Sequence, residues 1–113
     1  MSYGIFSEVY FAKHEMKKNL IKIGETTNAR RRACQLYKED YLILVSANVN
    51  GGESARLFVE SYLRTRIEAT GKAIRFRKDY FKCENEDVAH WLFTQFKEWV
   101  TEANHILELI KTS

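Results

Sequence analysis

The fold is decided by two neighbouring stretches of sequence, Val9-Tyr10-Phe11 and Ile21-Lys22-Ile23-Gly24-Glu25-Thr26-Thr27-Asn28-Ala29-Arg30-Arg31-Arg32-Ala33-Cys34-Gln35-Leu36. Both stretches begin with β-branched and aromatic residues, and a polar loop separates them, which is typical of a β-hairpin. The second stretch ends its apolar run at a lone glycine, and an arginine follows eight residues later on a predicted helix. This layout can direct Tyr10, Lys22 and Arg32 toward one point.

The length and composition of the chain are typical of a single globular domain. The chain has 113 residues, of which 45% are hydrophobic and 13% aromatic. A chain of this size and composition is expected to be globular rather than disordered, with room for one hydrophobic core. We therefore expect a single domain over residues 1–113, with a core over about residues 5–83 and a C-terminal helix over about 86–111.

The net charge of +3 is divided unevenly along the chain. Residues 1–83 hold 16 Lys and Arg against 9 Asp and Glu, a balance of +7, whereas residues 84–113 hold 2 against 6, a balance of −4. A basic surface is the footprint expected of a protein that binds a polyanion, although many ordinary domains carry one.

No run approaches the roughly 20 apolar residues of a membrane span, and the N-terminus lacks a basic segment followed by an apolar signal core. We therefore expect a cytoplasmic protein without a membrane partner. Cys34 and Cys83 show no metal-type spacing and are interpreted as reduced thiols, with one disulfide left open as an alternative. The three histidines are scattered, so no zinc site is predicted.

The expected secondary structure follows from apolar periodicity and capping residues. Strands are predicted at Ile5–Lys13, Leu20–Ile23 and Tyr41–Val49, and helices from Thr27 or Asn28 to about Lys38, from about Glu53 to Ala69, and after Asn85. The segment Ile74–Lys82 is predicted to be a short strand or an ordered arm. The expected fold class is α/β (α+β), with a small three-stranded antiparallel sheet flanked by helices.

The last predicted helix carries apolar residues at helical spacing, which indicates a buried face. Part of this stripe also alternates by four and three, as in a coiled coil: Leu92, Phe96, Trp99, Ala103, Ile106 and Ile110. Three heptads hardly distinguish a core face from a dimer contact. The core interpretation is favoured, and a homodimer through this helix is left open.

Over about residues 8–82 the sequence resembles the GIY-YIG nuclease superfamily, and more closely its phage and bacterial branch. Val9-Tyr10 matches the end of the first motif, with Glu8 where the family usually has glycine. Lys22-Ile23-Gly24 matches the second motif, with lysine in place of tyrosine. Arg32 and Glu60 fall where the family has its helix arginine and its metal-binding glutamate. Asp79-Tyr80-Phe81 is similar to the aromatic closing segment of this branch.

The resemblance implies a magnesium-dependent DNA endonuclease. Glu60 would be the only protein ligand of one Mg²⁺ (or Mn²⁺) per site, with water and phosphate oxygens completing its shell. Arg32, always charged, would clamp the scissile phosphate. Tyr10 would activate the attacking water with help from the charge of Lys22, which is itself the other candidate base.

Further residues are candidate nucleic-acid contacts. Tyr37 lies one turn beyond Arg32, and the remaining candidates are the arginines Arg30, Arg31, Arg56 and Arg64. Without the resemblance, the spacing of Arg56, Glu60 and Arg64 favours an ordinary salt-bridge ladder on one helix flank. Likewise, Tyr10 alone indicates a packed strand aromatic, and Lys22 alone indicates a solubilising charge on an edge strand.

Two alternatives to a nuclease remain. The first is a non-catalytic DNA- or protein-binding derivative of the same fold, favoured by the missing second-motif tyrosine and by the lack of a separate DNA-recognition domain. The second is an unrelated small adaptor or phage-encoded inhibitor that binds its partner with the C-terminal helix. An adaptor does not require Lys22, Arg32, Arg56 and Glu60 to meet in one cleft.

Overall fold

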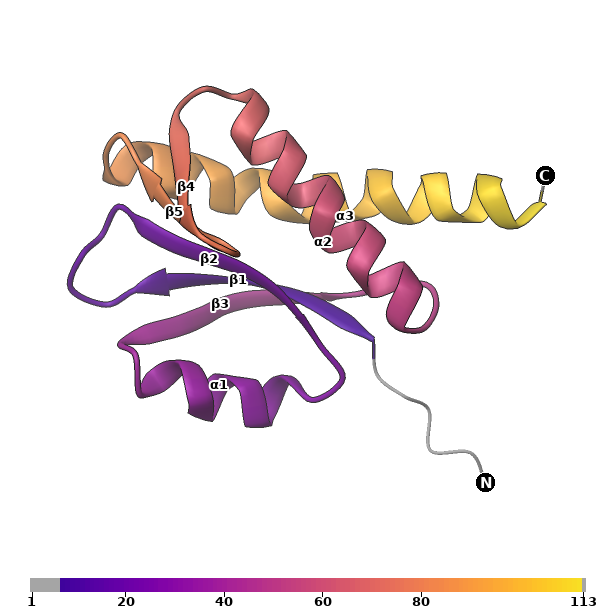
Figure 1. Cartoon of the computed structure of the whole chain (residues 1–113), viewed down its shortest axis with the longest axis horizontal. Coiled ribbons are helices and arrows are strands. Elements are labelled where there is room, and N and C mark those ends of the chain that lie inside the picture. Colours follow the sequence, from indigo (N-terminus) through magenta and orange to yellow (C-terminus); the bar gives the residue numbers. More distant parts are fainter. Residues whose placement is uncertain (1–6, 113) are drawn as a thin grey trace.

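A computed structural model of the chain describes residues 7–112, and the side chains of residues 7–111. It shows an α+β fold in which three helices surround a five-stranded antiparallel sheet (Figure 1). The elements in chain order are β1 (Glu8–His14), β2 (Leu20–Thr26), α1 (Ala29–Tyr37), β3 (Tyr41–Asn48), α2 (Glu53–Ala69), β4 (Ala73–Arg77), β5 (Tyr80–Cys83) and α3 (Glu86–Thr112). The strand order in the sheet is β3-β1-β2-β5-β4.

The expectation of three strands is wrong, because the segment predicted as a short strand or arm forms the β4–β5 hairpin. β5 pairs with the free edge of β2, with Leu20 opposite Lys82 and Lys22 opposite Tyr80. The turn of this hairpin contains no Gly, Asn or Pro, so the sequence does not indicate a turn there. Lys78 adopts a left-handed φ of 35° at this turn. A register shift between Arg75 and Arg77 further obscures the alternation.

The other elements follow the sequence-based prediction closely. The predicted start of the first strand at Ile5 lies outside the described residues. The Asn28 side chain caps α1 by accepting a hydrogen bond from the Arg31 amide at 3.0 Å, and Asn85 caps α3 by accepting one from the Val88 amide at 2.9 Å. α2 has the predicted bounds. Cys34 and Cys83 are both free thiols, as interpreted.

The two faces of the sheet are covered differently. α2 and α3 lie on one face and α1 on the other (Figure 1). Because side chains alternate along a strand, Val9 and Phe11 of β1 join the larger core with α2 and α3, whereas Tyr10 and Ala12 join a smaller cluster that includes Leu36 of α1. β1 is therefore buried on both faces, and the side chains of Tyr10 and Lys22 lie on the α1 face.

The apolar stripe of α3 belongs to the core of this chain. Leu92, Phe96 and Trp99 are buried in the larger cluster, together with Val100 and Ala103. Four of them, Leu92, Phe96, Trp99 and Ala103, belong to the six-residue seam considered for a coiled coil, so most of that seam is already covered within this chain. Among residues 7–112, none of the helices combines the length and apolar character that crossing a membrane requires.

Gly24 is required by a close approach between the two central strands. It lies opposite Tyr10 in the β1–β2 register, and the phenol ring crosses directly over its Cα. A Cβ at this position would collide with the Tyr10 hydroxyl and lie 2.6 Å from ring atom Cε2. Because Tyr10 is fully buried, its ring has no space into which it can retreat.

We expect Gly24→Ala to lower the free energy of unfolding by about 1–3 kcal/mol through this overpacking. In a Tyr10→Ala background the ring is gone, so the same substitution should be much less destabilising. Chemical denaturation of the four proteins of this cycle measures the coupling.

Gly52→Ala is the matched control, since a Cβ there meets no atom within 4 Å; it should lose less than about 1 kcal/mol. An equal loss from Gly24→Ala in both backgrounds would contradict the proposed clash.

Candidate functional site

The four principal candidate residues come from four different elements. Tyr10 lies on β1, Lys22 on β2, Arg32 on α1 and Glu60 on α2. The loop that leaves β2 after Thr26 turns the chain into α1, and this connection carries Arg32 back over the sheet. Arg32 and Glu60 interact with the Tyr10 phenol through their charges, and Lys22 is hydrogen-bonded to it.

Tyr10 and Lys22 form a buried pair at the centre of the site. The Lys22 ammonium donates a hydrogen bond from Nζ to the Tyr10 hydroxyl at 2.8 Å. The same Nζ lies 5.0 Å from the ring centre of Tyr80, within reach of a cation–π interaction. Lys22 is only 8% exposed, so its charge is held among aromatic groups rather than in bulk water. The interpretation of Lys22 as a solubilising edge charge is therefore wrong.

The Tyr10 phenol is surrounded by charges of both signs. Burial raises its pKa to about 12, and the negative charges of Asp79 and Glu60 add to this effect. Arg32 opposes the shift through its positive charge and as a hydrogen-bond donor to the phenol. Because burial and the carboxylates prevail, Tyr10 is a neutral phenol at neutral pH in this arrangement of charges.

Glu60 lies in an acidic pair that Arg64 bridges. Arg64 donates from Nη1 to Glu60 Oε1 at 3.2 Å and to Asp79 Oδ1 at 2.8 Å. The pKa of the Glu60 carboxyl is raised to about 7, chiefly by burial and next by the negative charge of Asp79, whereas the charge of Arg64 lowers it by less. One guanidinium is therefore not enough to neutralise the two carboxylates.

The carboxylate of Asp79 belongs to the site, but the sequence analysis did not predict this. It entered the prediction only as part of the aromatic segment Asp79-Tyr80-Phe81. Its position follows from the unpredicted hairpin, because the Asp79 carbonyl accepts a hydrogen bond from the Ile23 amide at 3.0 Å and so fixes the turn beside β2. The sequence did contain an indication of this role, because Asp79 directly follows a short basic segment that contains Arg75, Arg77 and Lys78.

Arg56 does not face the site in the way that a phosphate contact requires. It is 8% exposed, and its guanidinium donates to Glu25 Oε2 at 2.7 Å and to Ser7 Oγ at 2.9 Å. These bonds tie α2 to β2 and to the residue before β1. The salt-bridge ladder is thus only half formed, since Glu60 pairs with Arg64 and Arg56 pairs elsewhere. In this arrangement the guanidinium of Arg56 is engaged within the protein, and its role as a nucleic-acid contact stays a prediction.

The remaining candidates lie on the outer surface of α1. Arg30, Arg31 and Tyr37 are exposed, and none of them reaches the Tyr10–Lys22 pair in the described residues. Arg31 lines a hollow of about 270 Å³ together with Arg32 and Thr26, at the start of α1. They are therefore placed to contact a ligand that extends beyond the buried groups.

A shallow hollow of about 460 Å³ opens the site to solvent. It is lined by Lys22, Arg32, Arg77, Lys78, Asp79 and Tyr80. Two of the lining residues, Arg77 and Tyr80, are stacked, with the guanidinium carbon 4.3 Å from the ring centre. An anionic group entering this hollow meets four cationic side chains and one carboxylate.

Glu60 and Asp79 have the carboxylate oxygens that a hard divalent cation prefers, and Arg64 bridges them in the described structure. Magnesium prefers carboxylate oxygens and retains several water molecules, so one or two carboxylates suffice to hold it. Within residues 7–112, no group of three or more His, Cys, Asp and Glu side chains could form an all-protein cage. The raised pKa of Glu60 indicates negative charge that Arg64 leaves unbalanced, and Glu60 and Asp79 are the residues that would hold the ion.

The raised pKa of Glu60 predicts a specific pH dependence of stability. The pKa is about 7 in the folded chain, compared with an ordinary 4.5, so between these values folded Glu60 keeps a proton that the unfolded chain releases. The free energy of unfolding should therefore fall as pH rises through this window. Glu60→Gln removes the penalty, so relative to wild type it should gain about 1–3 kcal/mol between pH of about 5 and 8.

Denaturant unfolding at several pH values measures this difference. Glu68→Gln is the matched control, because Glu68 lies on the same helix with a side chain that is 45% exposed. Its stability should follow the wild-type profile. Parallel profiles for Glu60→Gln and wild type would show that the carboxyl titrates alike in the folded and unfolded chains.

Comparison with known families matches residues 8–100 to the T5orf172 domain. No curated protein and no solved structure matches the chain. The matched range contains all five strands, α1, α2 and more than half of α3, and it includes each residue of the candidate site. The chain belongs to the T5orf172 domain family.

Proposed function

We propose that this protein is a magnesium-dependent DNA endonuclease that uses a GIY-YIG-type arrangement with a single metal ion. The observation that carries the proposal is the convergence of Lys22, Arg32 and Glu60 from three elements around the buried phenol of Tyr10. Two of these residues, Lys22 and Arg32, also line the open hollow. The T5orf172 domain is found in endonuclease-associated proteins of phages and bacteria, which supports the same class of function.

Arg32 is the proposed clamp for the scissile phosphate. Its guanidinium lines the open hollow and also interacts with the buried Tyr10 phenol, so a phosphate bound there lies next to the proton acceptor. A guanidinium can bond two phosphate oxygens at once, and its charge persists at every working pH. Such a group is suited to the negative charge that develops on the phosphate oxygens during hydrolysis.

Tyr10 and Lys22 are the proposed pair that accepts the proton of the attacking water. A phenol with a pKa of about 12 is seldom ionised at neutral pH, so Tyr10 needs its neighbouring cations to act as a base. Lys22 donates to the phenol oxygen and therefore favours the phenolate. Lys22 is the alternative base, in which case Tyr10 holds its Nζ in position.

Glu60, with Asp79 beside it, would hold the divalent ion. Such an ion supplies positive charge for the phosphate oxygens and makes a bound water more acidic. Its charge would also offset the two carboxylates that raise the pKa of Tyr10. The same carboxylate pair therefore connects metal loading with the protonation of the proposed base.

The DNA duplex is proposed to lie along the basic side of the molecule. Arg30, Arg31 and Tyr37 on the exposed side of α1 are the proposed contacts that flank Arg32. Arg64 is less suited to this task while it bridges Glu60 and Asp79. Because residues 1–83 have a balance of +7, an affinity for DNA should be strongly dependent on salt.

A non-catalytic DNA-binding derivative is the second candidate, and one observation favours it. Arg64 already provides Glu60 with a salt bridge at 3.2 Å, which is the arrangement expected if this carboxylate is only structural. The lysine at position 22 replaces the tyrosine of the second GIY-YIG motif and leaves one tyrosine at the centre. Cleavage assays separate the two candidates.

The first test of function uses Glu60→Gln. The amide keeps the shape of the side chain but deletes the charge that a divalent ion needs, so cleavage should fall by at least about 100-fold while DNA binding survives or tightens. Wild type and variant are incubated with supercoiled, branched and single-stranded DNA in magnesium, manganese or EDTA. Added magnesium should also raise the thermal stability of wild type and not that of the variant.

Glu68→Gln again serves as the control and should cleave and respond to magnesium as wild type does. A wild-type protein that binds DNA yet cuts no substrate with either metal would rule out the nuclease and favour the non-catalytic candidate.

The second test separates the roles of Tyr10 and Lys22. Tyr10→Phe should abolish cleavage if the phenol oxygen is the base. Lys22→Met should move the rise of the rate with pH to higher pH, because the phenolate loses its cation and the pKa of the phenol increases. Single-turnover rates between pH of about 6 and 10 measure both effects. Full activity of Tyr10→Phe would remove Tyr10 from the mechanism and leave Lys22 as the surviving candidate for the base.

A further inference from the structure

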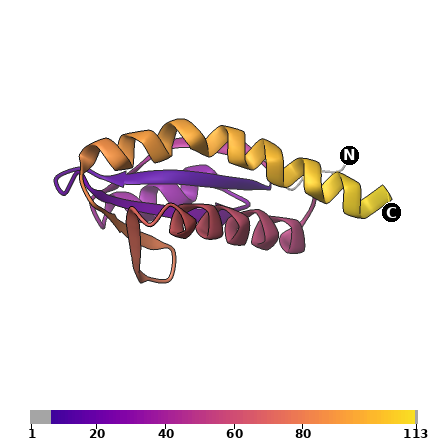
Figure 2. The same cartoon turned by 90° about the horizontal axis from the view of Figure 1, so that it is seen from above.

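The α1 face of the sheet is covered only in part. α1 packs against β3, and its residue Leu36 belongs to the cluster that buries Tyr10 and Tyr41, so α1 covers the part of this face formed by β1 and the start of β3. The β4–β5 hairpin extends beyond this cover and projects away from the helices (Figure 2). On this hairpin Phe76 is 51% exposed and Ile74 is 74% exposed. A solvent-exposed aromatic on an open strand face is suited to binding.

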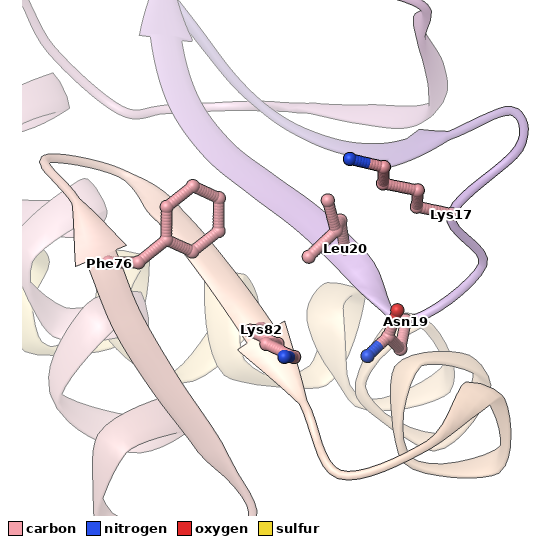
Figure 3. A pocket seen from close by; sticks show the side chains of 5 residues that line it. All are labelled: Lys17, Asn19, Leu20, Phe76 and Lys82. Carbon is pink, nitrogen blue, oxygen red and sulfur yellow. The ribbon is translucent and has the colours of Figure 1, made fainter.

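A hollow of about 480 Å³ lies between this hairpin and the start of β2. Its lining consists of Lys17, Asn19, Leu20, Phe76 and Lys82. Figure 3 shows Phe76 on β4 and Leu20 on β2 on either side of the hollow, with the Lys17 side chain extending over Leu20. We call these five residues the Phe76 platform.

The Phe76 platform is continuous with the candidate site. Leu20 is paired with Lys82, and two residues further along the same strands Lys22 is paired with Tyr80. Residues two apart on a strand share a face and lie about 7 Å apart, so the platform begins one step from Lys22. The ring centre of Phe76 is 6.0 Å from that of Tyr80, which lines the hollow of the site.

The charges around the platform suit an anionic chain. Among the described residues, neither the Lys17 nor the Lys82 ammonium has an ion-pair partner, so both are available to a ligand. The nearby carboxylate Glu39 is engaged by Arg77 and by the Tyr80 hydroxyl. An apolar ring between free lysines offers a stacking surface together with contacts for phosphates.

We propose that the Phe76 platform binds an unpaired nucleotide of the strand that leaves the candidate site. The face of an aromatic ring can stack on a base only when that base is out of the duplex, since paired bases are stacked on one another. The substrate class inferred in this way is DNA with an unpaired strand next to the cleaved phosphate, such as a fork, flap or branch. This inference rests on the proposed function, whose substrate it specifies.

The experiment measures binding in EDTA, where no cleavage can occur. The probes are a forked duplex with 2-aminopurine at its first unpaired positions and a blunt duplex with the same paired sequence. Wild type should prefer the fork and quench the 2-aminopurine fluorescence through stacking. Phe76→Ala should weaken fork binding by about five- to a hundredfold and abolish the quench, while blunt-duplex binding changes less than about twofold.

Matched variants separate stacking from loss of structure. Phe76→Tyr keeps the ring and should retain the quench. Lys82→Met should make the slope of log affinity for the fork against log salt concentration shallower, by about the amount expected for one phosphate contact. Trp91→Ala and Lys97→Met remove an exposed aromatic and an exposed lysine on α3 and should bind the fork as wild type does.

The outcomes distinguish this inference from the proposed function. A fork-specific quench that depends on Phe76 supports the platform even if wild type cuts no DNA. Equal affinity of wild type for fork and blunt duplex without a quench would overturn the platform, even if both substrates are cut.

Discussion

The crossing of the Tyr10 ring over Gly24 is the contact on which the rest of the site depends. Antiparallel pairing brings the two residues opposite each other, and the absence of a side chain at position 24 lets the phenol lie flat across the neighbouring strand. The hydroxyl is thereby presented to the ammonium of Lys22. In the sequence Gly24 resembles a turn residue, but in the structure its missing side chain leaves the space that the Tyr10 side chain fills.

Several charged side chains near this contact are buried. Lys22, Arg56 and Glu60 are all buried, and each has a partner of opposite charge or a hydrogen-bond acceptor. The partners differ in what they achieve. Glu25 satisfies Arg56 fully enough to make it structural, whereas Arg64 is shared between two carboxylates and leaves Glu60 hard to ionise. The second situation is typical of groups that act on a ligand.

Much of this architecture could be predicted from sequence, and the failures have physical causes. The three helices and the first three strands were recognisable because caps such as Asn28 and Asn85 coincide with changes in apolar period. The hairpin of β4 and β5 was not, since its turn depends on Lys78 in a left-handed conformation and its strand on a bulge. Asp79 was missed for the same reason, because its role as a charge follows from that turn.

The candidate site shows the same division. Spacing from Gly24 singled out Arg32, and the order of short motifs singled out Tyr10, Lys22 and Glu60. The spacing of Arg56 relative to Glu60 on α2 suggested a shared role that their surroundings do not support, since helical spacing specifies a flank and not the strand that the flank meets.

The alternation along β1 and β2 has an evolutionary consequence. Neighbouring residues such as Tyr10 and Phe11 serve the site and the core in turn, so inserting or deleting one residue in either strand would exchange the two sets. Change in length is therefore tolerated in steps of two within these strands, whereas the turn between His14 and Leu20 is free of this restriction. Divergence among related chains should accumulate at that turn, beside Lys17 and Asn19, and alter what the open face meets while leaving the buried pair untouched.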